Sequence, residues 1–456
     1  MASRWRFQYI WSLFSITFLS LNVIKNDSSG SSQMNGALGF QIPLYQPCGF
    51  FHNDIVNLLD NGKALQKGRL EENRWEIKDF ESKDESWKND LPLTGKTAVI
   101  TGAAGGIGGE LVKVIHRLGG TVVALDRDIE GLEQLKRLLT EEGSNLGYDG
   151  GLEDSRFWIL PTQHEDLDSV SHTANQIKSR FATIDLLVNN AGMTYNSDCT
   201  CGDDKMKAKN GKDLLFTVNY LSHFLLTEKL LPNLSKAKGR VVHLTSTYHW
   251  KVDGTEIIPS CDEGNPQAYE SDPSHQSPRH IERSYANSKL AQIYHSRTIN
   301  IHSPDCDSVC ACPTWAATGI GGEDARDFLG SMAFPIEGSN KGFNVKEHRY
   351  GAGISSAINA LFRTREELGD ALNCGTSFVA NSHILEFFVG RRSLLRWPIW
   401  RDTLTDLIGF CLLIGQRFTY EDFIIQETSP ESHDEDKRNK LYKWSKKEVK
   451  EWLHEP

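Results

Sequence analysis

From residue 93 onward, short apolar runs alternate with longer segments of helical periodicity. The apolar runs cover residues 96–101, 121–126, 157–162, 184–190, 240–246 and 309–314. In the segments between them apolar residues recur every three to four positions, which is typical of amphipathic helices. Among these segments, a long helix is predicted over 213–234 and another over 285–300. A last helix is predicted over 350–362 and a last strand over 376–381. Because apolar strands separated by such helices require a parallel sheet covered on both faces, the pattern predicts an α/β fold with a doubly wound, Rossmann-like sheet in three layers.

Before residue 93 the pattern changes. An apolar run over about residues 7–24 follows Arg4 and Arg6. A run of this length is near the lower limit for a helix that spans a bilayer, and no small-residue cleavage site follows it. We therefore expect residues 1–26 to be a signal-anchor that places the protein at a membrane, that of the endoplasmic reticulum, with a cleaved signal peptide as the alternative.

These changes of pattern divide the chain into five parts. We expect the signal segment (1–26), a linker and N-terminal extension (27–92), one Rossmann-like domain (93–380), an insertion (381–432) and a C-terminal helix that packs on the domain (433–456). The insertion interleaves arginines with tryptophans and leucines, which is typical of a segment at a membrane interface. A lid that packs on the domain is the equal alternative.

Charge and cysteine content exclude some classes of function. The net charge of −10 argues against a nucleic-acid binder, because neutralising phosphates requires a clustered excess of Lys and Arg. The nine cysteines are few for a disulfide scaffold, and Cys199 and Cys201 have no second Cys or His pair at ligand spacing. We therefore expect no metal site. Cys310 and Cys312 lie in the apolar run VCAC, where buried thiols are expected.

A glycine-rich turn lies between the first predicted strand and the helix after it. The turn is TGAAGGIG at residues 101–108. Gly102 permits the tight turn, while Gly106 and Gly108 let the backbone approach a pyrophosphate at the helix N-terminus. The spacing differs from the GxGxxG fingerprint, but the position after a strand and before a helix favours a nucleotide site.

Two charged residues at the end of the second strand bear on the choice of cofactor. Asp126 can accept hydrogen bonds from both ribose hydroxyls and repels a 2′-phosphate. Arg127, the next residue, would attract that phosphate. The pair therefore predicts NAD or NADP as the cofactor and favours NAD.

A tyrosine and a lysine stand at the spacing that general acid–base chemistry requires. Tyr285 and Lys289 are four residues apart and project from one face of the predicted helix. A phenol with a pKa near 10 is a poor base at neutral pH, but a neighbouring ammonium stabilises the phenolate and lowers that pKa. Tyr285 could then exchange a proton with a substrate oxygen while hydride moves to or from a nicotinamide. Ser246, at the end of a strand, can hydrogen-bond the same oxygen.

The order of these motifs across residues 93–380 resembles the short-chain dehydrogenase/reductase family. In chain order the motifs are TGAAGGIG, the NNAG of residues 189–192, Ser246, and the YxxxK pair of Tyr285 and Lys289. The segments VNYLSHFLLT and SYANSKLA are similar to the retinol dehydrogenase and WW-domain-containing oxidoreductase branch of that family. The tail LYKWSKKEV is similar to the final helix of that branch.

The resemblance implies roles for further residues. Asn219 is implied to be the fourth catalytic residue and to support a water-linked proton path from Lys289, which also serves the ribose hydroxyls. Thr318 is implied to lie against the nicotinamide carboxamide, and Asn190 to stabilise the central sheet and line the cofactor cleft. The cofactor-binding set is Thr101, Gly102, Gly106, Ile107, Gly108, Asp126, Arg127, Asn190, Ala191, Gly192, Tyr285, Lys289 and Thr318.

The chain also departs from the family pattern. Gln163 stands where related sequences often have an Asp beside the adenine, and Pro313 is followed by Thr314 where the family usually has glycine. The interval between Ser246 and Tyr285 is longer than in compact members, and its polar, proline-rich composition predicts a loop near the mouth of the cleft. None of the four catalytic positions is lost.

The resemblance implies an NAD(P)-dependent oxidoreductase that transfers hydride between nicotinamide and the alcohol or carbonyl group of an apolar small molecule, such as a retinoid, a steroid or another lipid. Within enzymes, the alternative is a 3-ketosteroid reductase of sterol synthesis. In a different class, the alternative is a catalytically silent cofactor-binding scaffold, against which the four retained residues argue. A homodimer is compatible with this function, and no nucleic-acid partner is expected.

Overall fold

A single parallel sheet forms the centre of the domain. The computed structural model describes residues 93–145, 156–194, 207–257, 278–313, 350–363, 417–418 and 428–453. Six strands in these residues pair in parallel in the order β3-β2-β1-β4-β5-β6. Their bounds are β1 Thr97–Thr101, β2 Thr121–Asp126, β3 Phe157–Pro161, β4 Leu186–Asn189, β5 Arg240–Leu244 and β6 Asp307–Ala311. The predicted doubly wound sheet is confirmed, while the strand expected over 376–381 lies outside the described residues.

Helices connect the strands of the parallel sheet. The chain also forms a second, two-stranded sheet. The helices and helical turns are α3 Gly106–Arg117, α4 Ile129–Asn145, α5 Leu167–Arg180, α6 Leu214–Phe216, η4 Thr217–Leu221, α7 Ser222–Ala237, η5 Thr247–Lys251, α8 Pro278–His302, α10 Ala352–Phe362, η8 Pro430–His433, α13 Glu435–Glu448 and α14 Lys450–Leu453. The small antiparallel sheet joins β7 Tyr350–Gly351 to β8 Arg417–Phe418.

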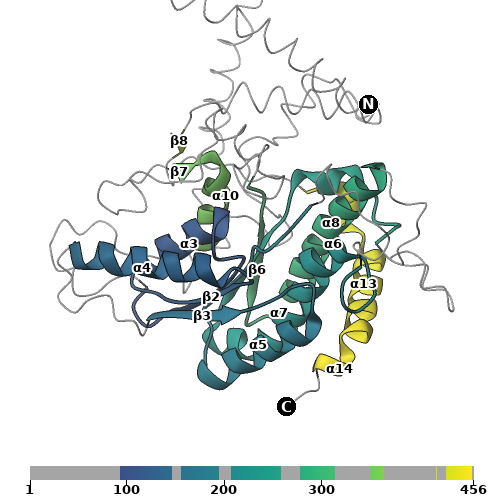
Figure 1. The fold of residues 1–456 in the computed structure, drawn as a ribbon. Helices are drawn as coiled ribbons and strands as arrows, with labels where there is room; N and C mark the ends of the chain where they lie inside the picture. Colours follow the sequence, from purple (N-terminus) through teal and green to yellow (C-terminus); the bar gives the residue numbers. More distant parts are fainter. Residues whose placement is uncertain are drawn as a thin grey trace, which may run out of the picture. The chain divides into compact units, whose positions relative to one another are not determined.

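Helices cover both faces of the parallel sheet (Figure 1). α3, α4 and α10 pack on a core that includes Ala98 and Ile100 of β1. α5, α7 and α8 pack on the opposite face, in the core that includes Val99. Successive side chains of a strand point to opposite faces, so the central residues of β1, Ala98, Val99 and Ile100, give the strand apolar side chains on both faces.

The C-terminal helices add a further layer outside the second face. α13 packs against α8, and α14 against α5 and α7. Leu441 and Val449 enter the same buried core as those helices. Lys229 of α7 donates to the Trp452 carbonyl at 2.6 Å, so this layer is fixed by polar contacts as well.

Three predicted helices differ from the structure. The helix predicted over 350–362 begins at Ala352 as α10, and the two residues before it form strand β7. The long helix expected near residues 213–234 is divided into α6, the wider π turn η4 and α7, because the turn accommodates one extra residue in the middle. The helix expected from residue 285 begins earlier, at Pro278. Cys310 and Cys312 are buried, as expected.

The membrane-directed segments of the sequence are outside the part of the chain described here. Within the described ranges, no helix has both the length and the apolar character needed to cross a bilayer. The signal-anchor expected over 1–26 and the arginine- and tryptophan-rich part of the insertion fall on residues that the structure does not describe.

Candidate active site

The glycine-rich turn forms a cradle at the N-terminus of α3. Gly102 and Gly106 have φ values of +65° and +57°, in the left-handed region that favours glycine. A Cβ atom on Gly108 would lie 2.1 Å from the Gly102 carbonyl oxygen and 2.6 Å from Nδ2 of Asn190. α3 begins after Gly105, which offers no side-chain cap. Amide groups at a helix N-terminus that lack a cap bind anions, so this cradle fits the pyrophosphate of a dinucleotide.

A side-chain network ties the cradle to the turn after β4. Oγ1 of Thr101 accepts the backbone N–H groups of Asn190 and Ala191, each at 2.9 Å. In return, Nδ2 of Asn190 donates to the carbonyls of Thr101 and Gly102 at 2.8 and 3.1 Å. The two turns therefore form one rigid edge at the carboxyl ends of β1 and β4, where open parallel sheets bind ligands.

Asp126 closes the cradle from the end of β2. Its Oδ2 accepts the Ala104 amide and its Oδ1 the Asp128 amide, each at 3.0 Å. The carboxylate is half-buried, whereas Arg127 is exposed. Carboxylate lone pairs beyond these two bonds remain for further donors.

Ser246, Tyr285 and Lys289 meet where β5 ends against α8. The Ser246 side chain is close enough to the Tyr285 phenol to favour a lower pKa of that group, although burial has the larger effect. Nζ of Lys289 lies 5.4 Å from the centre of the Tyr285 ring and donates to the Leu244 carbonyl at 2.8 Å. Burial raises the pKa of Tyr285 and lowers the pKa of Lys289 to about 8. Burial therefore keeps the phenol neutral, while a pKa of about 8 leaves Lys289 mostly protonated at neutral pH.

Asn219 lies in the π turn η4 and is fully buried. Its Oδ1 accepts the Met193 amide at 2.8 Å, and its Nδ2 donates to the Met193 carbonyl at 3.0 Å and to Oγ of Ser288 at 3.1 Å. A Cβ atom on Gly192 would lie 3.3 Å from Oδ1 of Asn219 and 3.8 Å from Nζ of Lys289. The four residues expected to be catalytic are therefore neighbours in the fold, and the π turn follows the tendency of such turns to occur at functional sites.

A buried histidine that the sequence did not single out connects these parts. Nδ1 of His223 lies 3.1 Å from the Asn219 carbonyl oxygen, and Nε2 lies 3.0 Å from Oγ1 of Thr101. A carbonyl only accepts, so Nδ1 carries the hydrogen and Nε2 accepts the threonine hydroxyl. Burial holds the pKa of His223 well below its ordinary value. In the sequence it stands among apolar residues of a helix, where a histidine of the core gives the same pattern.

A second buried histidine predicts acid sensitivity. Nδ1 of His164 lies 2.8 Å from Oγ of Ser222, and burial lowers the pKa of His164 from 6.5 to about 4. Between these pH values the unfolded chain binds a proton that the folded chain does not, so folding stability falls as pH drops from 6.5 towards 4, by about 3 kcal/mol from this group. His164→Asn, which cannot titrate, should lose correspondingly less stability over that range, measured by denaturant unfolding at several pH values. The exposed His172 supplies the control: in His172→Asn, folding stability should change with pH as it does in the wild type. The same wild-type pH dependence in His164→Asn would contradict the assignment.

The remaining predicted residues divide into described and undescribed positions. Gln163 follows β3 and is exposed at the same edge of the sheet. Pro313 is described, while Thr314, Thr318 and the loop over 258–277 lie outside the described residues. Ile107 is buried in the core beneath the cradle.

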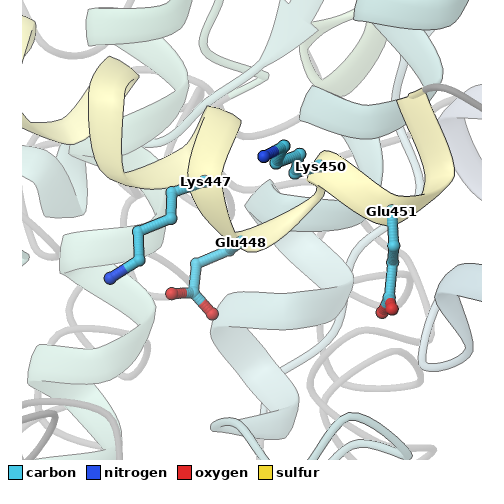
Figure 2. Close-up of a pocket in the computed structure, with 4 residues that line it drawn as sticks. All are labelled: Lys447, Glu448, Lys450 and Glu451. Atoms are coloured by element: carbon cyan, nitrogen blue, oxygen red, sulfur yellow. The ribbon is translucent and has the colours of Figure 1, made fainter.

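A charged depression on the C-terminal helices shares no lining residue with this site. Figure 2 shows it lined by Lys447, Glu448, Lys450 and Glu451. Glu448 forms an ion pair with Lys212, with Nζ and Oε2 3.2 Å apart. Alternating charges of this kind are typical of a solvated helix surface, and none of the predicted site residues lines the depression.

Comparison with known proteins identifies relatives of the central region. Residues 96–252 match the family model for short chain dehydrogenase. The human dehydrogenase/reductase SDR family member 7 is 31% identical over 164 residues, which cover 35% of this chain and 45% of that protein. Human retinol dehydrogenase 13 is 31% identical over 161 residues (34% and 43%), and mouse polyprenol dehydrogenase 33% identical over 165 residues (35% and 44%). The matches span less than half the length of each relative, and they confirm the family resemblance.

Proposed function

We infer that this chain is an NAD(P)-dependent oxidoreductase of the short-chain dehydrogenase/reductase type, which acts on the alcohol or carbonyl group of an apolar molecule. The observation that carries the proposal is the meeting of Ser246, Tyr285 and Lys289 at one place: Ser246 favours a lower pKa of the Tyr285 phenol, and Nζ of Lys289 lies 5.4 Å from the centre of the same ring. These groups stand at the edge of the sheet that also carries the glycine cradle. A scaffold protein would have no use for that combination.

The residues of the site divide the chemistry among them. The Tyr285 hydroxyl gives a proton to the substrate oxygen in reduction and takes it back in oxidation, while Ser246 donates a hydrogen bond to the same oxygen. A bound nicotinamide supplies or accepts the hydride. Burial opposes ionisation of the phenol, so the charge of a protonated Lys289 is needed to bring the Tyr285 pKa down towards neutrality. Asn219 holds the Met193 backbone beside that lysine.

The cradle residues would hold the cofactor. The amides of Gly106, Ile107 and Gly108 at the start of α3 would bind the pyrophosphate, and Asp126 the adenosine ribose. Asn190, Ala191 and Gly192 form the adjoining wall. We propose that Thr318 contacts the nicotinamide carboxamide, as the family resemblance implies.

Asp126 sets the preference for NAD in this proposal. Its carboxylate repels a 2′-phosphate, while the exposed Arg127 is free to turn towards one. Asp126→Ser should therefore lower kcat/KM with NADH about tenfold and raise it with NADPH, which reverses or levels the ratio. Parallel kinetics with the two cofactors would measure it, with Asp128→Ser as the control for loss of a charge in the same loop. An unchanged ratio would contradict the role of Asp126.

The surroundings of Tyr285 support an apolar substrate. The half-buried ring of Tyr248 meets the Tyr285 ring edge to face, with centroids 5.5 Å apart and planes at 83°. Nζ of Lys251 lies 3.7 Å from the centre of the Tyr248 ring and holds it in place. Two of the relatives are named for apolar alcohols, retinol and polyprenol.

Tyr248 therefore offers a test of the substrate class. Tyr248→Ala should raise KM for a retinoid or polyprenol about tenfold and alter kcat less, because an aromatic wall contributes on the order of 1–3 kcal/mol to binding an apolar group. KM for a small polar ketone should change less than threefold. An equal rise for both substrates would indicate general damage to the site.

The function itself is tested by binding and turnover. Purified protein should quench or shift nicotinamide fluorescence, and should oxidise or reduce at least one member of a panel of retinoids, steroids and polyprenols with NAD(H) or NADP(H). No binding of either cofactor would refute the proposal. Cofactor binding without turnover on any carbonyl or alcohol would favour the scaffold alternative. We also propose that residues 1–26 anchor this activity at the endoplasmic reticulum membrane.

A further inference from the structure

His249 connects the catalytic serine to a distant part of the chain. It lies in the helical turn η5, three residues after Ser246, and only 3% of its surface is exposed. Its Nδ1 is 2.6 Å from the Ser246 carbonyl oxygen. Its Nε2 is 3.2 Å from the backbone nitrogen of Ser429. The two ring nitrogens therefore face two backbone groups that are far apart in sequence.

These partners determine the tautomer of the imidazole. A carbonyl oxygen only accepts a hydrogen bond, so Nδ1 must carry the hydrogen. A backbone N–H only donates, so Nε2 must be bare. The Ser429 amide thus selects the one form of His249 that donates to Ser246, as the partner of one ring nitrogen commonly fixes the state of the other.

The Ser429 amide is itself held against the helix that carries Tyr285 and Lys289. Tyr294 of α8 donates its hydroxyl to the Glu431 carbonyl at 2.7 Å. Arg297, one turn further along, donates to Oγ1 of Thr428 at 2.8 Å. Residues 428–433, which we call the docking segment, are therefore anchored on α8 beside η5.

The Ser246 backbone receives two donors on one carbonyl. Besides Nδ1 of His249, the His249 backbone amide donates to it at 3.2 Å. Ser246 is held extended, with φ −155° and ψ 153°, at the start of the turn. This backbone conformation fixes the direction of its Cβ, and hence the place of the hydroxyl beside the Tyr285 phenol.

We propose that His249 is a positioning residue for Ser246. We further propose that the docking segment acts on the catalytic centre because its Ser429 amide sets the tautomer of the His249 imidazole. The proposal rests on the proposed function, because it concerns the serine that would contact the substrate oxygen. In this proposal His249 acts through Ser246 and not through a contact of its own with the substrate. Its effect should appear in kcat, because a displaced serine hydroxyl weakens the hydrogen bond to the substrate oxygen at the moment of proton transfer.

Two substitutions separate the two ends of the histidine. The amide nitrogen of Asn can take the place of Nδ1 and donate to Ser246, but Asn cannot reach Ser429. The amide oxygen of Gln can take the place of Nε2 and accept from Ser429, but the donor to Ser246 is lost. Tyr294→Phe serves as the matched control, because it removes a hydrogen bond to the docking segment without a contact to Ser246.

The experiment measures kcat, KM, the cofactor Kd and hydrogen exchange of the Ser429 amide in the full chain. His249→Gln should lower kcat about tenfold, keep the cofactor Kd within twofold, and leave the Ser429 amide protected. His249→Asn should lose less than threefold in kcat while the Ser429 amide exchanges faster. Tyr294→Phe leaves both hydrogen bonds of His249 in place, and Arg297 still anchors Thr428, so this variant should keep the wild-type kcat and the wild-type exchange of the Ser429 amide.

The possible results discriminate between explanations. Equal kcat losses in His249→Gln and Tyr294→Phe, or a parallel loss of cofactor binding, would mean that His249 is merely structural and would overturn the proposal. Wild-type kcat in His249→Gln would overturn it too. Failure of the wild-type protein to turn over any substrate would refute the proposed function instead, and Ser429 exchange in the two variants would still report whether His249 holds the docking segment.

Discussion

Tyr285→Phe should abolish turnover and leave cofactor binding intact. The substitution removes one oxygen, the group that we assign to proton exchange with the substrate, and keeps the ring that packs against Tyr248. General acid–base catalysis contributes about 10²–10⁴ in rate, so kcat should fall at least a hundredfold. The cradle of Gly102, Gly106 and Gly108 is untouched, so the Kd for the dinucleotide should stay within about twofold of wild type. Steady-state kinetics and fluorescence titration would measure the two quantities.

A second tyrosine of the same helix provides the control. Tyr294 is buried and also donates its hydroxyl to a hydrogen bond, in that case to the Glu431 carbonyl. Tyr294→Phe removes the corresponding hydroxyl oxygen from another tyrosine of α8 and should keep kcat near the wild-type value. If Tyr285→Phe kept more than about a tenth of wild-type kcat, another group would have to supply the proton, and our assignment would be wrong.

Gly108→Ala should abolish cofactor binding. The added methyl would lie 2.1 Å from the Gly102 carbonyl oxygen and 2.6 Å from Nδ2 of Asn190, closer than van der Waals contact allows. Both neighbours belong to the network that joins the turns after β1 and β4, and backbone atoms cannot rotate away as a side-chain end can. The cradle must therefore open. We expect the dinucleotide Kd to rise at least about a hundredfold, because a site displaced by an ångström loses several hydrogen bonds at once.

Gly109 is the matched control for this substitution. It is the next residue of the same helix, and a Cβ atom there would meet nothing nearer than 3.6 Å, an ordinary contact. Gly109→Ala should bind cofactor like the wild type and should be more stable by about 0.5–1 kcal/mol, because alanine favours a helix interior. Calorimetric titration and thermal unfolding of both variants test the pair. Equal affinity in Gly108→Ala and Gly109→Ala would show that the cradle yields without cost.

The six strands of the parallel sheet and the spacing of Tyr285 and Lys289 have local signals in the sequence, whereas Asn219 was proposed only from the family resemblance. Each strand is a short apolar run, and Tyr285 and Lys289 are one helical turn apart. The π turn at Asn219 was not predictable from the sequence, because a single extra residue in a helix leaves the apolar periodicity almost unchanged over so short a stretch. The early start of α8 at Pro278 was missed because that segment is polar and resembles the loop before it.

His223 and His249 show a different limit of sequence analysis. Each acts through both ring nitrogens, and each has partners on elements that only the fold brings together. Thr101 and His223 are 122 positions apart, and His249 and Ser429 are 180 apart. A single histidine in a sequence has the same pattern whether it bridges two distant groups or simply fills a core. Their roles therefore became visible only in the three-dimensional arrangement.

The docking of the C-terminal helices also has a consequence for the order of folding. Tyr220, next to Asn219, is hydrogen-bonded to Oγ of Ser445 across 225 positions of sequence, and His249 to Ser429 across 180. Contacts of such long range close large loops, and closing a large loop costs chain entropy. We therefore expect these contacts to form late in folding. The nascent sheet and its nearer helices can form first. Catalytic competence would then be acquired last, when the distal helices settle behind the two turns that carry Asn219 and Ser246.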